Sequence, residues 1–250
     1  MRCTIALVLL LLMPRAGLAQ SRITIDLRGK SQQLNLYGPA SGIPVILSSG
    51  DLGWAGLVVH VAELLSSRGY YVIGFNSRSY LASFTSRENK LKPENVPGDY
   101  ETLIALARQN SSAKPILAGI SEGAGLSVLA AADPEVKQGI QGVLALGLPD
   151  QNELGWKWRD FTIWITKKAP HEPSFMVEDI IDRLSPLPLA EIHSTHDEFL
   201  PLEKAREIFS KAGEPKRMWV IESADHSFRG NRTELDLRIV EATEWIQSHG

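Results

Sequence analysis

The chain has 250 residues, of which 44% are hydrophobic, and its formal net charge is −3. This length and apolar content suffice for one sizeable domain, and the mildly acidic balance without a long basic run argues against a nucleic-acid groove. The single cysteine, Cys3, lies in the N-terminal segment described next, so the rest of the chain has no thiol for a disulfide.

The N-terminus has the features of a secretory signal. Arg2 precedes an apolar stretch over residues 5–13, and the small-residue ending AGLAQ places the expected cleavage after Ala19. The apolar stretch is too short to persist as a membrane anchor, and no second stretch of spanning length follows it. The sequence therefore predicts a signal peptide over 1–19 and one exported domain over 20–250.

Short apolar runs alternate with helix-like segments along the chain. ITIDL and LNLY alternate polar and apolar residues, as the strands of an antiparallel edge hairpin do. Continuous apolar runs, typical of strands buried on both faces, follow at 44–48, 70–75, 115–120, 140–147, 189–194 and 217–222. Helices are expected over 55–69, 96–109, 201–213 and 233–248. This alternation predicts an α/β fold with a mostly parallel sheet and helices on both faces.

Two stretches fall outside this rhythm. Residues 77–97 are polar and basic, and because loops at strand ends carry substrate contacts in such folds, Arg78 and Tyr80 are candidate substrate-binding residues. Residues 149–187 contain several prolines and the aromatic residues Trp156, Trp158, Phe161 and Trp164. Core packing is the favoured explanation of these aromatic residues, since large aromatic side chains are mostly buried. Whether this stretch forms a lid is left open.

The pentapeptide GISEG at 119–123 lies between a predicted strand and a run of small residues. It fits the pattern G-x-S-x-G, in which a nucleophilic serine stands on a sharp strand-to-helix turn that has no room for bulky neighbours. Ordinary glycine-rich turns also match this pattern. Ser121 is therefore a candidate nucleophile that needs partners.

Two residues that could activate Ser121 follow the last two predicted strands. Asp197 comes just after 189–194, and His226 comes just after 217–222. The order serine, acid, histidine is that of the α/β-hydrolase fold, and the carboxyl ends of parallel strands meet at one edge of the sheet. An imidazole can accept the serine proton, and a carboxylate fixes the tautomer of the imidazole and stabilises its cation.

The acid has two competitors. Asp197 is preferred to Glu198 because it comes first after the strand. Asp225 adjoins His226 in sequence, so we expect it to shape the turn there.

A metal site is the alternative for the segment that contains His193 and His196. Positions three apart on a strand face opposite sides, so these two residues could share a metal only if the strand had already ended. No other ligand cluster is evident in the sequence. We therefore expect neither a metal nor a cofactor.

A serine hydrolase also needs two N–H donors for the oxyanion, one directly after the nucleophile and one from a loop after an earlier strand. Glu122 supplies the first. The second is expected in SSGDLGW at 48–54, with the Asp51 N–H as the leading candidate and the Leu52 N–H as the alternative. The same segment would also suit a simple strand-to-helix turn.

SGDLGW, AGLVVHVAELLSSRGYYVIGFNSRSY, GISEGAG, THDEFLP and ADHSF together resemble the bacterial virulence protein VirJ family, which includes the C-terminal domain of AcvB. The resemblance runs from about Val45 to the end of the chain. It implies an α/β-hydrolase fold, export to the periplasm, a link to type IV secretion and virulence, and hydrolysis of aminoacylated phosphatidylglycerol. Carried over by position, it implies catalytic roles for Ser121, Asp197 and His226.

The chain departs from the family pattern at two positions. Glu122 stands where the family usually has an aromatic residue, and Asn76 stands where it typically has an aspartate. Neither departure removes a member of the expected catalytic set.

From these features we expect a periplasmic serine hydrolase that cleaves an ester of a small molecule or of a lipid at the membrane surface through an acyl-enzyme. The alternative is a non-catalytic accessory protein that uses the same fold to bind a component of the secretion system.

Three acidic residues adjoin the expected catalytic positions: Asp51, Glu122 and Glu198. They would suit a substrate with a cationic group near the ester, as in lysyl-phosphatidylglycerol, and Arg78 would meet its phosphate through paired N–H donors. The alternative is that Glu122 only stabilises a helix start and that Asp51 and Glu198 are solvated turn residues.

Overall fold

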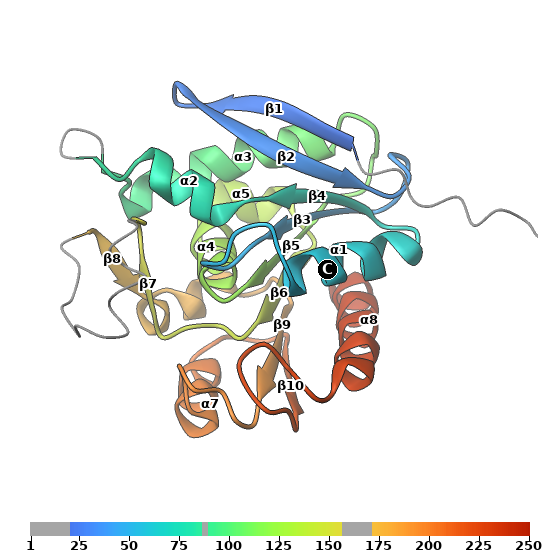
Figure 1. Cartoon of the computed structure of the whole chain (residues 1–250), viewed down its shortest axis with the longest axis vertical. Coiled ribbons are helices and arrows are strands. Elements are labelled where there is room, and N and C mark those ends of the chain that lie inside the picture. The colour runs from blue at the N-terminus through green and yellow to red at the C-terminus, as the bar shows by residue number, and fades with distance from the viewer. Residues whose placement is uncertain (1–20, 87–89, 157–171) are drawn as a thin grey trace, which may run out of the picture.

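The computed structural model describes residues 21–86, 90–156 and 172–250. Its centre is an eight-stranded sheet with the strand order β1-β2-β4-β3-β5-β6-β9-β10 (Figure 1). Strands β1 (Ser21–Leu27) and β2 (Lys30–Tyr37) form an antiparallel edge hairpin, and β2 is also antiparallel to β4. The remaining strands run parallel to one another: β3 (Pro44–Ser48), β4 (Tyr71–Phe75), β5 (Ile116–Ile120), β6 (Gly142–Leu146), β9 (Leu189–Ser194) and β10 (Lys216–Ile221). The predicted edge hairpin and mostly parallel sheet are confirmed.

Burial explains the two kinds of strand pattern. Every residue of β3, β4, β5, β6 and β9 is buried, so these strands are continuous apolar runs with few exceptions. In β1, exposed and partly buried residues alternate, because one face of an edge hairpin meets solvent.

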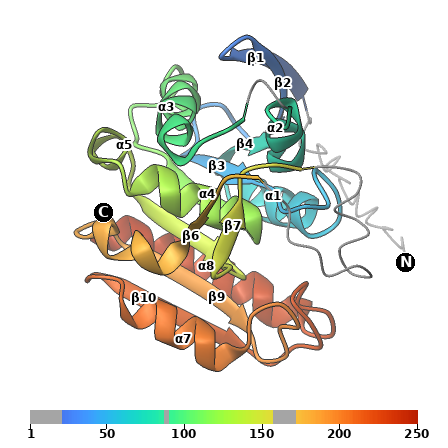
Figure 2. The same ribbon diagram turned by 90° about the vertical axis from the view of Figure 1, so that its left-hand side faces the viewer.

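Helices cover both faces of the sheet (Figure 2). One apolar cluster joins the sheet to α1 (Leu57–Ser67) and α8 (Arg232–His249). A second cluster on the other face joins it to α2 (Ser77–Ser83), α3 (Val96–Ala107), α4 (Glu122–Ala131), α5 (Pro134–Gly139) and α7 (Leu202–Ser210). The helices expected over 55–69, 96–109, 201–213 and 233–248 are confirmed, with slightly different ends.

Short elements fill the connections. Strands β7 (Gln151–Glu153) and β8 (Ser174–Met176) pair antiparallel in a separate small sheet. Single 3₁₀ turns occur at η1 (Pro93–Asn95), η3 (Val177–Asp179) and η4 (Ile181–Leu184).

Helix α2 is the main element that the sequence did not predict. It lies within the polar stretch 77–97 and begins where Asn76 Oδ1 accepts a hydrogen bond of 3.2 Å from the Ser79 N–H. With 7 residues it spans about two turns, and a helix of this length is too short to show a recognisable helical repeat of apolar residues in the sequence.

Some expectations concern residues outside the described ranges. These are the signal peptide over 1–19 and the aromatic residues Trp158, Phe161 and Trp164. Trp156 is described, and it packs partly buried against the core, as expected. Across the described ranges, no helix combines the length and apolar character needed to cross a membrane.

Candidate active site

The candidate residues gather at the carboxyl edge of the parallel strands. Ser121 follows β5, Asp197 follows β9 and His226 follows β10. The 48–54 loop follows β3, and Arg78 lies in α2 after β4. Because parallel strands end at the same edge, these segments from distant parts of the chain meet there.

Ser121 stands on a strained turn between β5 and α4. Its φ of 54° and ψ of −123° are values that residues other than glycine rarely adopt, and such strain costs about 1–3 kcal/mol. A Cβ on Gly119 would lie 2.1 Å from the Gly123 oxygen, and a Cβ on Gly123 would lie 2.4 Å from the Ser48 oxygen. Both glycines of the pentapeptide are therefore required by close backbone packing around the serine.

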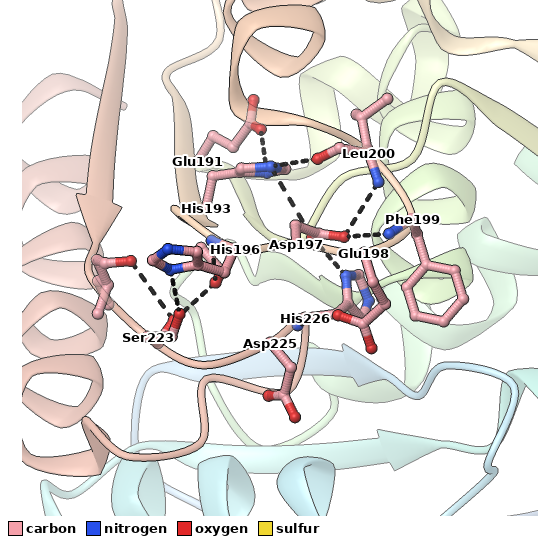
Figure 3. Close-up of polar contacts among 12 residues, drawn as sticks. Glu191, His193, His196, Asp197, Glu198, Phe199, Leu200, Ser223, Asp225 and His226 are labelled. Atoms are coloured by element: carbon pink, nitrogen blue, oxygen red, sulfur yellow. Dashed lines mark hydrogen bonds and ion pairs between the residues drawn. The ribbon is translucent and has the colours of Figure 1, made fainter.

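Asp197 and His226 form a hydrogen-bonded pair (Figure 3). His226 Nδ1 donates to Asp197 Oδ2 at 2.6 Å. The other carboxylate oxygen, Oδ1, accepts from the backbone N–H groups of Phe199 at 2.9 Å and Leu200 at 3.1 Å. Burial alone would raise the pKa of Asp197, but the hydrogen bonds from His226, Leu200 and Phe199 outweigh it and lower that pKa. The ionised acid thus holds the His226 proton on Nδ1.

The His226 ring lies at the end of β6, next to the serine turn. A Cβ on Gly147, which has a φ of 59°, would lie 2.5 Å from His226 Cε1 and 3.2 Å from Nε2. The preceding residue, Leu146, accepts the Ser121 N–H at 2.9 Å. His226 Nε2 is buried and has no hydrogen-bond partner in the described part of the chain. It can therefore accept a proton, and a serine–histidine contact often tightens only when substrate binds.

The 48–54 loop passes directly beside the nucleophile. A Cβ on Gly50 would lie 3.2 Å from Ser121 Cβ, so the backbone at Gly50 runs against the serine. A tight turn follows, in which Gly53 N–H donates to the Gly50 oxygen at 2.9 Å. Asp51 N–H makes no backbone hydrogen bond within the described ranges, and the Asp51 and Leu52 side chains are exposed. The Asp51 and Leu52 N–H groups both remain candidate oxyanion donors, with Glu122 N–H at the start of α4.

Arg78 lies at the margin of this region. Its guanidinium group stacks over the Trp156 ring, with Cζ 4.0 Å from the ring centroid. Its Cδ would be 3.5 Å from a Cβ on Gly53, so the side chain runs along the 48–54 loop. The half-buried Arg78 is therefore a cation next to the candidate oxyanion loop.

Tyr80 is not available to a substrate, which corrects the sequence prediction. Its side chain is fully buried, and its hydroxyl donates to Asp99 Oδ2 at 2.5 Å. Burial, followed by the charge of Asp99, raises the pKa of Tyr80 far above its usual value. Tyr80 occupies the inward face of α2 with Ser77 and Leu81, whereas Arg78 lies on another face of the helix.

The acidic neighbours of the pair have local contacts. Glu198 is exposed, and its Oε2 accepts the backbone N–H of His226 at 2.8 Å, which holds the histidine turn against the acid turn. Asp225 accepts the Arg229 N–H at 3.1 Å and also pairs with the Arg229 side chain, as expected for a residue that shapes the turn. Glu122 is half-buried, and its carbonyl accepts from Asn152 Nδ2 at 3.1 Å.

The two histidines considered as metal ligands lie in different surroundings. His193 is buried, whereas His196 is exposed and its Nδ1 lies 2.9 Å from the Ser223 oxygen. The structure, as far as it is described, contains no group of three or more side chains suited to hold a metal ion.

Sequence reasoning missed two features of this region. Gly147 follows β6, and a glycine directly after a strand at the site edge was the only signal of its contact with His226. Glu191 was included only as part of a strand, and His193 was considered only as a possible metal ligand, although ionisable residues at alternate positions of a buried strand are unusual.

A mostly parallel sheet with helices on both faces, and a serine turn, an acid turn and a histidine turn at its carboxyl edge, has the architecture of the α/β hydrolases. The chain matches the family model "Bacterial virulence protein (VirJ)" over residues 43–244. It belongs to the VirJ family, and the resemblance noted in the sequence is thereby confirmed.

Other similarities are more distant. The protein YfhR of Escherichia coli O157:H7, described as uncharacterized, is 24% identical over 199 residues, which cover 76% of this chain and 65% of that protein. The chain thus spans just under two thirds of the length of this relative.

Solved structures with low sequence identity share the fold. Est1E from Butyrivibrio proteoclasticus has a TM-score of 0.68 at 16% identity, covering 91% of this chain and 99% of that one. A dienelactone hydrolase from Anabaena variabilis has a TM-score of 0.65 at 14% identity, covering 93% and 99%. A membrane phospholipase A, described as a novel bacterial virulence factor, has a TM-score of 0.69 at 11% identity, covering 91% and 87%.

Proposed function

We propose that this protein is an exported serine hydrolase that cleaves an ester through an acyl-enzyme, with Ser121 as nucleophile, His226 as general base and Asp197 as the orienting acid. The observation that carries the proposal is the 2.6 Å hydrogen bond between Asp197 and His226. In this arrangement His226 Nε2 is buried, has no hydrogen bond to any described residue, and lies at the end of β6, where the backbone of the serine turn is also bound.

In the first half of the reaction, Ser121 Oγ attacks the ester carbonyl and its proton passes to His226 Nε2. The Asp197 carboxylate stabilises the resulting imidazolium. The oxyanion of the tetrahedral intermediate accepts hydrogen bonds from the Glu122 N–H and from Asp51 or Leu52. The C–O bond to the leaving alcohol then breaks, and the alcohol takes the proton from His226. Water attacks the acyl-serine by the same steps and releases the acid.

A fluorophosphonate probe and a panel of short p-nitrophenyl esters test this proposal. The probe should phosphonylate Ser121, and the esters should be hydrolysed with saturable kinetics. A protein that neither labels nor hydrolyses any ester would instead support the alternative, a non-catalytic accessory protein that binds a secretion component through the same fold.

Gly147→Ala should lower kcat for a short ester by roughly 100-fold, because a small displacement of a catalytic group has an effect of that order. The added methyl group would collide with the His226 ring and would also need a φ of 59°. Gly230→Ala is the matched control, since Gly230 has a φ of 86° but its Cβ position lies more than 4 Å from every atom of the described ranges outside its immediate neighbours. Equal losses in the two variants would show that backbone strain, and not the position of His226, is responsible.

For the substrate we propose an aminoacylated phosphatidylglycerol at the periplasmic membrane surface. Two features support this class. Arg78, beside the 48–54 loop, is suited to bind a phosphate, and Trp156 under its guanidinium group limits its freedom. Asp51 follows Gly50, whose backbone runs against Ser121, and Glu122 directly follows the serine in the chain; negative charge at these positions would favour a cationic aminoacyl group. Because Glu198 already binds the histidine turn, it is a weaker candidate for this contact.

Charge neutralisation tests this substrate class. In the double variant Asp51→Asn, Glu122→Gln, kcat/KM should fall roughly tenfold more for a lysyl ester than for an alanyl ester, the size of one lost charge contact. Arg78→Ala should lower kcat/KM only for esters that contain a phosphate. Glu244→Gln, which removes an exposed charge on α8, is the control. If the ratio of kcat/KM for the lysyl ester to that for the alanyl ester is unchanged in the double variant, Asp51 and Glu122 do not contribute to substrate selection.

A further inference from the structure

A second imidazole–carboxylate pair lies behind Asp197, on the side away from His226 (Figure 3). Glu191 and His193 occupy alternate positions of β9, so their side chains lie on the same face of the sheet. Glu191 is 1% exposed and His193 is 0% exposed. Two ionisable groups in such a place are costly to bury unless they are paired.

Among the described residues, the groups that interact with the His193 ring are two carboxylates and a backbone carbonyl, which are all hydrogen-bond acceptors. Nδ1 lies at ion-pair distance, 3.5 Å, from Glu191 Oε1 and makes no hydrogen bond among the described residues. Nε2 is 3.0 Å from the Leu200 carbonyl oxygen and 3.8 Å from Asp197 Oδ2, the same oxygen that accepts from His226. A ring with a carbonyl oxygen at one nitrogen and a carboxylate at ion-pair distance from the other favours a proton on both nitrogens.

The rest of the environment is apolar. The strand neighbours are Ala145 and Met218 beside Glu191 and Val220 beside His193, and α7 buries Ala205 and Ile208 on this face. Helix α8 covers the opposite face. Among the described residues, the charged groups that act on His193 are therefore Glu191 and Asp197 alone.

Burial and the nearby Asp197 charge raise the pKa of Glu191, whereas the polar contact with His193 and the charge of that ring act to lower it. An ionised Glu191 beside Asp197 therefore depends on a proton on His193. Burial alone would lower the pKa of His193, but the Glu191 carboxylate, the Leu200 carbonyl and Asp197 together raise it. The pH at which this ring loses its charge is thus shifted upward by the groups around it.

We propose that His193 is a positioning residue that acts as a buried imidazolium paired with Glu191. Its positive charge keeps the Asp197 carboxylate ionised. The same charge weakens the electrostatic effect of the Asp197 carboxylate on His226. The proposal rests on the proposed hydrolase function. His193 Nε2 also binds the Leu200 carbonyl, and the Leu200 N–H binds Asp197, so the same side chain fixes the turn that carries the acid.

The consequence lies in the pH range of activity. A general base must be neutral in the free enzyme to accept the serine proton, so activity falls on the acid side, where the base becomes protonated. A carboxylate next to an imidazole favours its protonated form, and a cation behind the carboxylate opposes that effect. His193 thereby extends activity toward lower pH.

Glu191→Gln is the principal test. Without its anionic partner the buried ring loses its charge, while Nε2–H still donates to Leu200. The acid limb of kcat/KM for a p-nitrophenyl ester should move to higher pH by roughly half a unit, with KM little changed. His193→Gln keeps an N–H donor and removes the cation, so the acid limb of kcat/KM should move in the same direction. Either variant is sufficient for the test if the other fails to fold.

Histidine NMR on the full-length protein gives a readout that needs no substrate. Wild-type His193 should have both ring nitrogens protonated at neutral pH, and the pKa of His226 should rise in Glu191→Gln. Asp99→Asn is the control, because Asp99 is a carboxylate 2% exposed that binds Arg28 and Tyr80 instead. It should lower stability without moving the pKa of His226.

A neutral His193 in the wild-type protein would overturn the proposal, as would an unchanged pKa of His226 in Glu191→Gln. Failure of the hydrolase proposal looks different: no ester is turned over, while the NMR titration still reports on the His193 charge.

Discussion

Ser121→Ala is expected to abolish ester hydrolysis and covalent labelling by fluorophosphonate, with a loss in kcat of roughly 10⁴ to 10⁶-fold. The expected loss is this large because, in the proposed mechanism, the Ser121 Oγ atom forms the acyl-enzyme. Intact-mass spectrometry after labelling and steady-state kinetics on a short ester measure the two effects.

The fold should survive this substitution. Alanine removes one oxygen atom from a half-buried position, and the backbone hydrogen bond from residue 121 to Leu146 does not involve the side chain. Ser210→Ala, on an exposed serine at the end of α7, is the control and should label and turn over like the wild type. Undiminished turnover in Ser121→Ala would place the nucleophile elsewhere.

Asp197→Asn should lower kcat by roughly 10⁴-fold with little change in KM, as expected when a catalytic histidine loses the carboxylate that fixes its tautomer. An asparagine at this position can offer its NH₂ group to Nδ1, which would place the imidazole proton on Nε2 and block its role as a base. The kinetics of the purified variant on the same ester, over a range of pH, provide the measurement.

Asp225→Asn is the matched control for this result. Asp225 is about as buried as Asp197, at 7% exposure for each, but it holds Arg229 instead of the histidine ring. Its substitution should loosen the turn and reduce activity far less. Equal losses, or a greater loss in Asp225→Asn, would mean that the acid has been wrongly assigned.

Much of the candidate site could be placed from the sequence, because its parts are local. Ser121, Asp197 and His226 each come directly after an apolar run that forms a buried parallel strand. Each run is recognisable by itself, and parallel strands end at one edge, so the meeting of the three turns follows without knowledge of any contact.

Other parts depend on contacts between distant segments. Tyr80 was assigned to the site because its segment is polar, but α2 turns this side chain toward Asp99 in the core. The role of Gly147 depends on the His226 ring, which comes from the last parallel strand. Glu191 and His193 acquire their relation to Asp197 only when the following turn folds back so that Leu200 reaches His193. No period or motif in a single segment encodes such contacts.

The proposed nucleophile and general base follow strands that differ in how many neighbouring strands they pair with. Strand β5, which carries Ser121, has a partner on each side, whereas β10, which carries the His226 turn, pairs only with β9 in the described sheet. Free energies of local opening are generally smallest at such margins and largest at the centre. The hydrogen bonds of His226 with Glu198 and Asp197 therefore stabilise the histidine turn at the edge of the sheet. On warming, the proposed catalytic residues would separate there first, while the serine turn and the central strands are still in place.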